Sequence, residues 1–390
     1  MKINNIIKNP WAHVAFLTVL VALLFFNATL SPQDDSFSYQ KFAETLVNNH
    51  RMDFSIPGFH GADFFTAIIY FFTRSSLSVL YLDILFAIIS VPMIYLAVRE
   101  IFRAQARDGL YETAGVFAAY IYVLSPIEYT NALRGGHHTV MIFFSLSGLY
   151  LLFKNSKWSF LPMGVSYIVR PFAIALFPLF LYKKKYKQLL LSLVIPALYV
   201  IAEYVQIGKV FIGVHSDLTV TNVFSIKRFF LNLVYAVQNY FSFHNYSFLN
   251  NLDSLDMVHL SPFITFLALA AILFFRVFFT DKKFFSALAL SGAFSIILPS
   301  LLYHLDMWYL WVFNFTLILL AIPVMLQWKR IVPFVVASFG FQFLYLYIAT
   351  KVNYWVKGGY FLFGVFGLIV VVSIIYTFIN YKKNENTIGM

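Results

Sequence analysis

Two adjacent carboxylates, Asp34 and Asp35, directly follow the first long apolar run of the chain, Trp11 to Leu30. Only 17 of the 390 residues are Asp or Glu, so an acidic pair at the end of an apolar segment is an unusual feature. Acidic side chains at membrane depth generally serve a function. We therefore interpret Asp34 and Asp35 as part of an active site that faces the membrane, over which the rest of the chain builds a cavity. The alternative is that the pair caps the helix that follows.

Two further polar residues lie in the same hydrophilic segment. His60 and Asp63 precede a short apolar stretch that begins at Phe64. We expect them to complete the site from the other end of the segment. Asp63 could instead cap the helix that starts at Phe64, and His60 could lie at the membrane interface.

A glycine turn carries a second set of candidates. Arg134 and His137 flank Gly135 and Gly136. Cationic side chains and backbone amides at such a turn suit a phosphate group, although an ordinary solvated loop would have the same composition. His137 and His138 are adjacent and lack the i, i+4 spacing of helical metal ligands, so the pair is a weak indication of a metal site.

Arg170 interrupts an apolar segment, Trp158 to Tyr182, that has lysines at both ends. A cation at the break of such a segment needs an anionic partner, and a phosphate or a carboxylate such as Asp35 would serve. His304 and Asp306 precede a late apolar run and are further candidates, with an interfacial position as the alternative.

The composition places these residues in a membrane protein. The chain is 61% hydrophobic, 20% aromatic and 12% charged, with a mean hydropathy of +0.76. Its apolar runs are continuous, which favours membrane helices over barrel strands. The net charge of +11 does not indicate nucleic-acid binding, because Lys and Arg form short clusters between apolar runs. No cysteine is present, so disulfides and thiolate chemistry are excluded.

We predict an all-α polytopic membrane protein, a helical bundle with about ten full spans and a re-entrant pair of half-helices in 158–182. Both termini are expected in the cytoplasm. The expected full spans are Trp11–Leu30, Leu77–Val98, Ala114–Leu124, Val140–Phe153, Leu189–Tyr204, Pro262–Phe279, Phe284–Tyr303, Tyr309–Gln327, Ile331–Ile348 and Tyr360–Ile379.

The external segments are expected to carry the site. The first external loop, 31–76, should hold two interfacial helices over 37–47 and 64–72, the first with Phe37, Phe42 and Leu46 on one face. A longer external loop is expected over 206–259. We treat 1–390 as a single transmembrane domain.

Several short motifs together resemble those of the GT-C superfamily of glycosyltransferases. The motifs are Asp34-Asp35-Ser36-Phe37-Ser38-Tyr39, the set Gly58, His60, Gly61 and Asp63, Ser125-Pro126 before Gly135-Gly136, and the half-helices around Arg170-Pro171. The resemblance covers 1–182 as a GT-C-like module, and the variable half 183–390 only by topology. His304 and Asp306 stand where many members have an arginine.

The resemblance implies a mannosyltransferase- or arabinosyltransferase-like membrane enzyme. Such an enzyme moves a sugar from a polyprenyl-phosphate carrier to a glycan, lipid or cell-envelope acceptor on the outer face of the cell membrane, with inversion. Asp35 would be the base, Arg170 and Arg134 would hold the phosphate, and Tyr39 would line the site. Asp34 and Asp35 are also candidate ligands for Mg²⁺ or Mn²⁺. The alternative is a transporter or flippase of lipid-linked sugar, but the two halves show no internal repeat.

Overall fold

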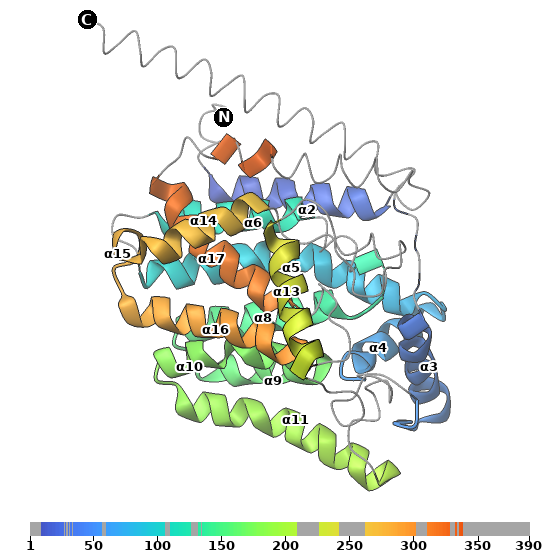
Figure 1. The fold of residues 1–390 in the computed structure, drawn as a ribbon. Helices are drawn as coiled ribbons and strands as arrows, with labels where there is room; N and C mark the ends of the chain where they lie inside the picture. Colours follow the sequence, from blue (N-terminus) through green and yellow to red (C-terminus); the bar gives the residue numbers. More distant parts are fainter. Residues whose placement is uncertain are drawn as a thin grey trace, which may run out of the picture.

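Every regular element that the structure describes is a helix (Figure 1). The computed structural model describes residues 9–26, 28, 30, 32, 34–56, 60–105, 110–125, 132–133, 135–208, 226–241, 262–301, 310–327, 332–333 and 335–337. At Asp34 and Asp35 it describes the backbone but not the side chains. The α-helices are α2 (Pro10–Phe26), α3 (Asp34–Asn49), α4 (Asp63–Thr73), α5 (Ser78–Arg103), α6 (Tyr111–Leu124), α8 (His138–Phe153), α9 (Phe160–Val169), α10 (Phe177–Tyr182), α11 (Tyr186–Ile207), α13 (Ile226–Phe241), α14 (Pro262–Leu273), α15 (Phe275–Phe278), α16 (Lys282–Ser300) and α17 (Trp311–Gln327), and the 3₁₀-helices are η1 (Lys157–Ser159) and η2 (Pro171–Leu176).

Three of the described helices, α5, α11 and α16, are long and apolar enough to cross a membrane. A helix satisfies its own backbone hydrogen bonds, which a segment in lipid requires. The structure is therefore consistent with a membrane protein. Most expected spans in the described residues coincide with a helix, although α14 and α15 divide the expected span 262–279 at Phe274. The expected spans 331–348 and 360–379 fall almost entirely outside the described residues.

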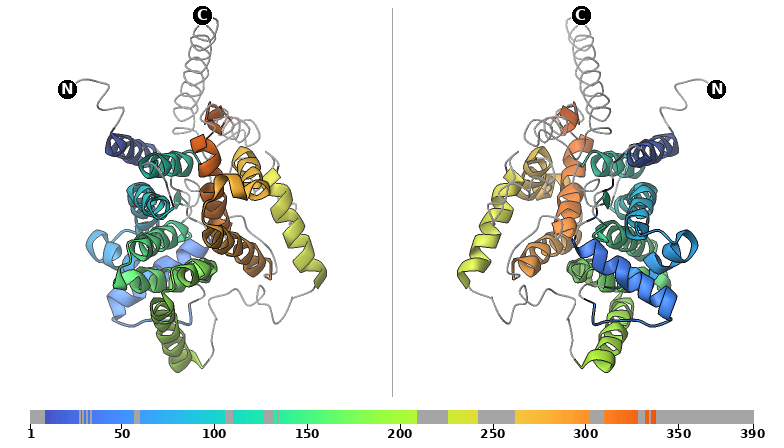
Figure 2. Two further views of the ribbon diagram at one scale, coloured as in Figure 1. Left: turned by 90° about the vertical axis from the view of Figure 1, so that its left-hand side faces the viewer. Right: turned by 90° about the vertical axis from the view of Figure 1, so that its right-hand side faces the viewer.

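The helices form two groups that lie side by side (Figure 2). The helices from α2 to α11 make one group, and α13, α14, α16 and α17 make the other. Contacts of α10 and η2 with α16, and of α6 with α17, join the two groups. Within the first group α5 packs on α2, α6 and α8, so α5 is the element on which this group is assembled.

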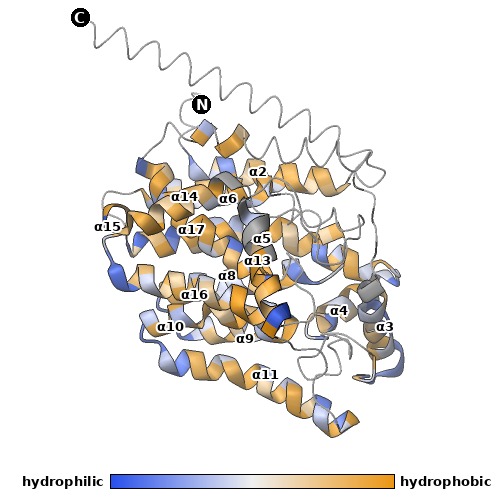
Figure 3. Cartoon of the chain, in the orientation of Figure 1, coloured by the Kyte–Doolittle hydropathy of each residue, from blue (hydrophilic) through white to orange (hydrophobic). Residues whose placement is uncertain are grey.

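Hydrophilic segments gather at the two ends of the helices, and the helical segments between them are mostly apolar (Figure 3). One end carries α3 and α4, and we call it the α3–α4 end. The other holds the junctions between α8 and η1, between α10 and α11, and between α15 and α16. We call this second end the lysine-rich end, after Lys154, Lys157, Lys183, Lys184, Lys185, Lys187, Lys282 and Lys283.

The segment around Arg170 leaves the lysine-rich end and returns to it. The rings of Phe153 and Tyr182 are 6.4 Å apart between centroids, so the residues that precede and follow the segment are neighbours. The break lies where the sequence predicts it, because proline disfavours a helical conformation for the residue before it. Arg170 accordingly has an extended backbone, with φ −149° and ψ 114°.

The first hydrophilic segment contains the two expected helices, α3 and α4, which pack on each other. The predicted apolar face of α3 is wrong in one residue. Phe42 is fully buried, but Phe37 is 62% exposed. Five residues separate the two, and residues share a helix face at spacings of three or four. The buried face instead runs from Tyr39 through Phe42 and Ala43.

Gly61 brings this segment into direct contact with α9. A Cβ atom on Gly61 would lie 2.3 Å from the carbonyl oxygen of Ile168, which is backbone and cannot rotate away. By contrast, a Cβ on Gly208 would meet nothing within 4 Å. The first segment is therefore seated on α9 at a position that excludes any side chain.

We expect Gly61→Ala to lower the thermal unfolding midpoint in detergent strongly, because the added methyl group must displace α9 or the loop, at a cost of roughly 1–3 kcal/mol or more. Gly208→Ala is the matched control. Its only expected cost is that of a left-handed φ of 66°, about 1 kcal/mol. Equal midpoints for the two variants would contradict the close contact.

Candidate functional site

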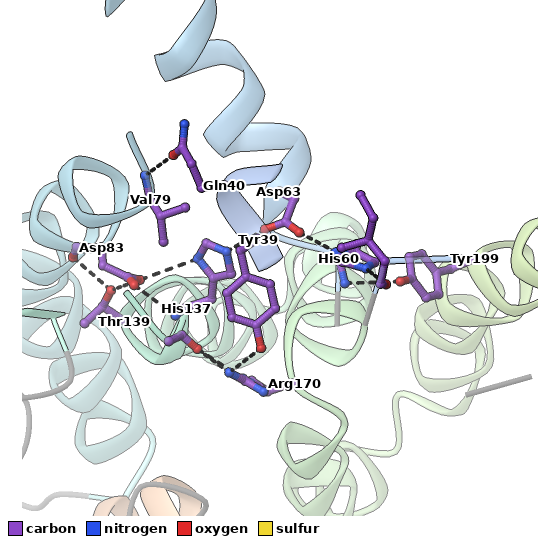
Figure 4. A network of polar contacts seen from close by, with 12 residues as sticks. Tyr39, Gln40, His60, Asp63, Val79, Asp83, His137, Thr139, Arg170 and Tyr199 are labelled. Carbon is purple, nitrogen blue, oxygen red and sulfur yellow. Dashed lines mark hydrogen bonds and ion pairs between the residues drawn. The ribbon is translucent and has the colours of Figure 1, made fainter. Parts of the chain in front are cut away.

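Asp63 bridges two histidines from separate parts of the chain (Figure 4). It is the first residue of α4, and it is fully buried. Its Oδ2 lies 2.6 Å from Nδ1 of His60, and its Oδ1 lies 2.6 Å from Nε2 of His137. The N-cap of α4 is Ala62, and the Asp63 side chain bonds to the two histidines, so the capping alternative for Asp63 is wrong.

Asp83 holds the other side of His137. One carboxylate oxygen accepts a hydrogen bond from the backbone N–H of His137 at 2.9 Å, and the other lies 3.8 Å from its Nδ1. The hydroxyl of Thr139 donates to the same carboxylate at 2.8 Å. All three residues are buried. Together with His60 and Asp63 they form what we call the His–Asp network.

The turn before α8 gives His137 its position. Gly135 and His137 both have a positive φ, of 73° and 60°. A Cβ on Gly135 would come within 2.9 Å of Ser36 and Val79 side-chain atoms, so the turn lies against α3 and α5. A left-handed histidine costs about 1–3 kcal/mol of backbone strain. Hydrogen bonds to Asp63 and Asp83 offset this cost.

Arg170 joins the same turn to α3. Its Nε and Nη2 donate to the carbonyl oxygen of Gly136 at 3.2 and 2.5 Å, and Nη2 also donates to the hydroxyl of Tyr39 at 3.1 Å. The ring of Tyr39 lies 4.6 Å from the ring of His137. Arg170 is 5% exposed. The break between α9 and η2 therefore lies beside the His–Asp network.

His60 is held on all sides. Its Nε2 lies 2.6 Å from the carbonyl oxygen of Ile56, which can only accept, so that nitrogen carries a proton. The ring of Phe42 stacks on it at 4.1 Å, and the Tyr199 hydroxyl accepts from its backbone N–H at 3.2 Å. His60 is 1% exposed, so the interfacial alternative for this residue is wrong.

Carboxylates on both sides favour a charged His137. Burial by itself lowers the pKa of this imidazole, but the hydrogen bonds and charges of Asp63 and Asp83 more than offset burial and raise the pKa to about 9. At neutral pH the His137 imidazolium therefore donates to Asp63, and its charge lies between the side chains of Asp63 and Asp83. An ionised and paired group of this kind positions its neighbours rigidly.

The predicted site residues fall into two sets. The structure brings five of them together at the α3–α4 end, namely Tyr39, His60, Asp63, His137 and Arg170. Of the histidine pair, His138 is also buried, at the first turn of α8, which excludes a solvated loop for both. Arg134, His304, Asp306 and the side chains of Asp34 and Asp35 lie outside what the structure describes.

Asp83 and Thr139 are site residues that sequence reasoning missed. Asp83 lies inside the expected span 77–98, among apolar residues. A single carboxylate in such a run is itself an indication of function or of a buried partner. The position of Asp83 in the sequence therefore indicates a buried partner. It does not identify that partner, because His137 is 54 residues away.

Among the described residues, neither a metal site nor the cavity between α2, α6 and α17 coincides with this network. Among the described residues no group of three or more His, Asp or Glu side chains is arranged to hold a metal ion. A cavity of about 650 Å³ lies between α2, α6 and α17 and is largely apolar, with His13, Glu112 and Tyr120 among its lining residues. None of the predicted site residues lines it.

No family model, no curated protein and no solved structure matches this chain.

We expect Asp63→Asn to destabilise the protein by about 3–5 kcal/mol, because breaking a buried ion pair on one side leaves the other charge uncompensated. The measurement is thermal unfolding in detergent. Asp53→Asn is the control, since Asp53 lies in the same segment but only bonds locally to Ser55. A loss for Asp63→Asn no larger than that for Asp53→Asn would contradict a structural role of the bridge.

We also expect stability to fall with rising pH. The folded pKa of His137 lies above the ordinary value of 6.5, so its contribution is complete below about 6.5 and is lost as pH rises through about 9. One proton gives a slope of at most about 1.4 kcal/mol per pH unit. Unfolding midpoints measured from pH 6 to 10 should show this decline in the wild type and a weaker one in His137→Gln. Parallel profiles would exclude His137 as its source.

Proposed function

We propose that this chain is an integral-membrane glycosyltransferase that moves a sugar from a polyprenyl-phosphate carrier to a glycan, lipid or cell-envelope acceptor. The observation that most supports this proposal is the position of α3 beside Arg170. The acidic pair occupies the first turn of α3, and Tyr39, one turn after Asp35, meets Arg170. The backbone of the acidic pair and the guanidinium of Arg170 thus lie at the same end of the helices, and glycosyl transfer from a phosphate requires both a carboxylate and a cation.

The proposed membrane arrangement follows from the lysines. Positively charged residues favour the cytoplasmic side, so the lysine-rich end would face the cytoplasm and the α3–α4 end the outside of the cell membrane. The return of Tyr182 to Phe153 supports a re-entrant half-helix pair over 158–182. In this arrangement about ten full spans and both termini in the cytoplasm remain our expectation.

In the proposed reaction the acceptor hydroxyl gives its proton to Asp35, and its oxygen forms a bond to the anomeric carbon of the sugar. The bond from that carbon to the phosphate oxygen breaks, and the leaving polyprenyl phosphate takes the electron pair. A single displacement of this kind inverts the anomeric centre. Asp34 would orient the acceptor or bind a divalent cation such as Mg²⁺ or Mn²⁺.

Positive charge near the leaving group would stabilise the transition state. We assign this role to Arg170, with Arg134 and His304 as further predicted contributors. Asp306 stays a predicted contact to the substrate. The His–Asp network does not need to touch the substrate in this proposal. By fixing the Gly135–His137 turn, it fixes the carbonyl group of Gly136 that receives two donors of Arg170.

We expect Asp35→Asn to abolish sugar transfer, because the amide cannot accept the proton, while the protein still folds and binds carrier. The measurement is transfer from a panel of radiolabelled polyprenyl-phosphate sugars to lipid-reconstituted protein, with and without divalent cations. Asp34→Asn should retain part of the activity if Asp34 is the supporting group. Asp53→Asn, an acid of the same segment, is the control and should remain active.

The same assay separates the proposal from the alternative function. Full activity of Asp35→Asn would remove Asp35 from the mechanism. No turnover with any carrier, together with carrier binding that survives both substitutions, would favour a transporter or flippase of lipid-linked sugar.

A further inference from the structure

Lysines from three segments converge at the lysine-rich end. Tyr182, just before Lys183, donates a hydrogen bond from its hydroxyl to Asp281, which directly precedes Lys282, at 2.8 Å. The ring of Phe153, just before Lys154, lies 6.2 Å from the ring of Phe284. The ends of α8 and α10 and the start of α16 therefore meet around one aromatic cluster, and each brings lysines to it.

The positive charge of these eight lysines is only partly compensated within the described part of the chain, where Asp281 interacts with Lys283. None of the eight lysines forms an ion pair within 4 Å of a described carboxylate. Among the described residues, Asp281 is the acidic side chain that bonds to this junction, and its carboxylate accepts from the Tyr182 hydroxyl and from the backbone N–H groups of Lys283 and Phe284. An external anion would supply the missing charge.

Mutual repulsion acts on Lys183, which is one of the two half-buried lysines. Burial lowers the pKa of Lys183, and the charge of Lys185 lowers it further. The ammonium group of Lys183 also lies 5.3 Å from the ring centroid of Phe153. A bound anion would favour the charged form of Lys183, which the protein alone disfavours.

Apolar side chains beside the lysines indicate what kind of molecule carries the anion. Trp158, Leu181, Tyr186 and Leu190 are each more than 40% exposed next to Lys157, Lys183, Lys185 and Lys187. A free phosphate would leave this apolar surface in water. A phospholipid would cover it with acyl chains while its headgroup meets the lysines, and aromatic residues are enriched at that depth of the membrane.

We propose that the junction of α8, α10 and α16 at the lysine-rich end is a binding site for the phosphate headgroup of an anionic phospholipid. Basic pockets between helices at one membrane face bind such headgroups through several lysines at once. The site lies at the far end of α5 from the His–Asp network, and α5, with 26 residues, is roughly 39 Å long at the usual helical rise. It is therefore independent of the proposed catalytic function.

The test is native mass spectrometry of the purified full-length protein in non-ionic detergent, titrated with phosphatidylglycerol or phosphatidylcholine. We expect saturable binding of phosphatidylglycerol in preference to phosphatidylcholine. The double variant Lys183→Gln with Lys282→Gln should lose about 30-fold in affinity for phosphatidylglycerol, since each lysine near such a headgroup contributes about fivefold.

The matched control is Lys41→Gln with Arg51→Gln, which removes the same charge at the α3–α4 end and should leave the affinity unchanged. Thermal unfolding of both double variants confirms that they fold. Equal binding of the two lipids, or equal loss in the two double variants, would overturn the proposal. Competition by glycerol phosphate at the lipid's own concentration would show that the site takes a free phosphate, which would also overturn it.

Discussion

The bridge that Asp63 forms between two imidazoles organises the α3–α4 end. A carboxylate buried away from water is tolerated only when it is paired and hydrogen-bonded. Asp63 meets both conditions by fixing His60 of its own segment and His137 of a distant one. The start of α8 is thereby placed, its preceding turn receives Arg170, and Arg170 holds Tyr39 of α3. Four segments thus depend on one buried charge and its partners.

The helices could largely be predicted because each apolar segment is recognisable from its own sequence, without knowledge of its contacts. An apolar run with hydrophilic ends predicts a helix whatever its neighbours are, and a proline after Arg170 predicts the break before it. The predicted face of α3 is wrong at Phe37, because a separation of five residues does not place two side chains on one face of a helix. The full number of spans stays a prediction, since much of the last part of the chain lies outside the described residues.

The site was harder to predict, because its contacts join residues that are far apart in sequence. The residue types of His60, Asp63, His137 and Arg170 were sufficient to select them. Their partners were not predictable, since spacing along the chain does not say which carboxylate meets which histidine. Asp83 is absent from the predicted site, although its apolar neighbours make an unpaired carboxylate costly and so indicate a buried partner. The role of Asp34 and Asp35 stays a prediction.

The seating of Gly61 on the carbonyl group of Ile168 has a consequence for biosynthesis. The two residues are about 100 positions apart, and chains are made at roughly 5–20 residues per second, so Gly61 exists for roughly 5–20 s before its partner does. During that interval the α3–α4 segment has no α9 to dock on. The rate of translation therefore limits the assembly of this end. Assembly can be completed only after the segment that turns at Arg170 has been synthesised.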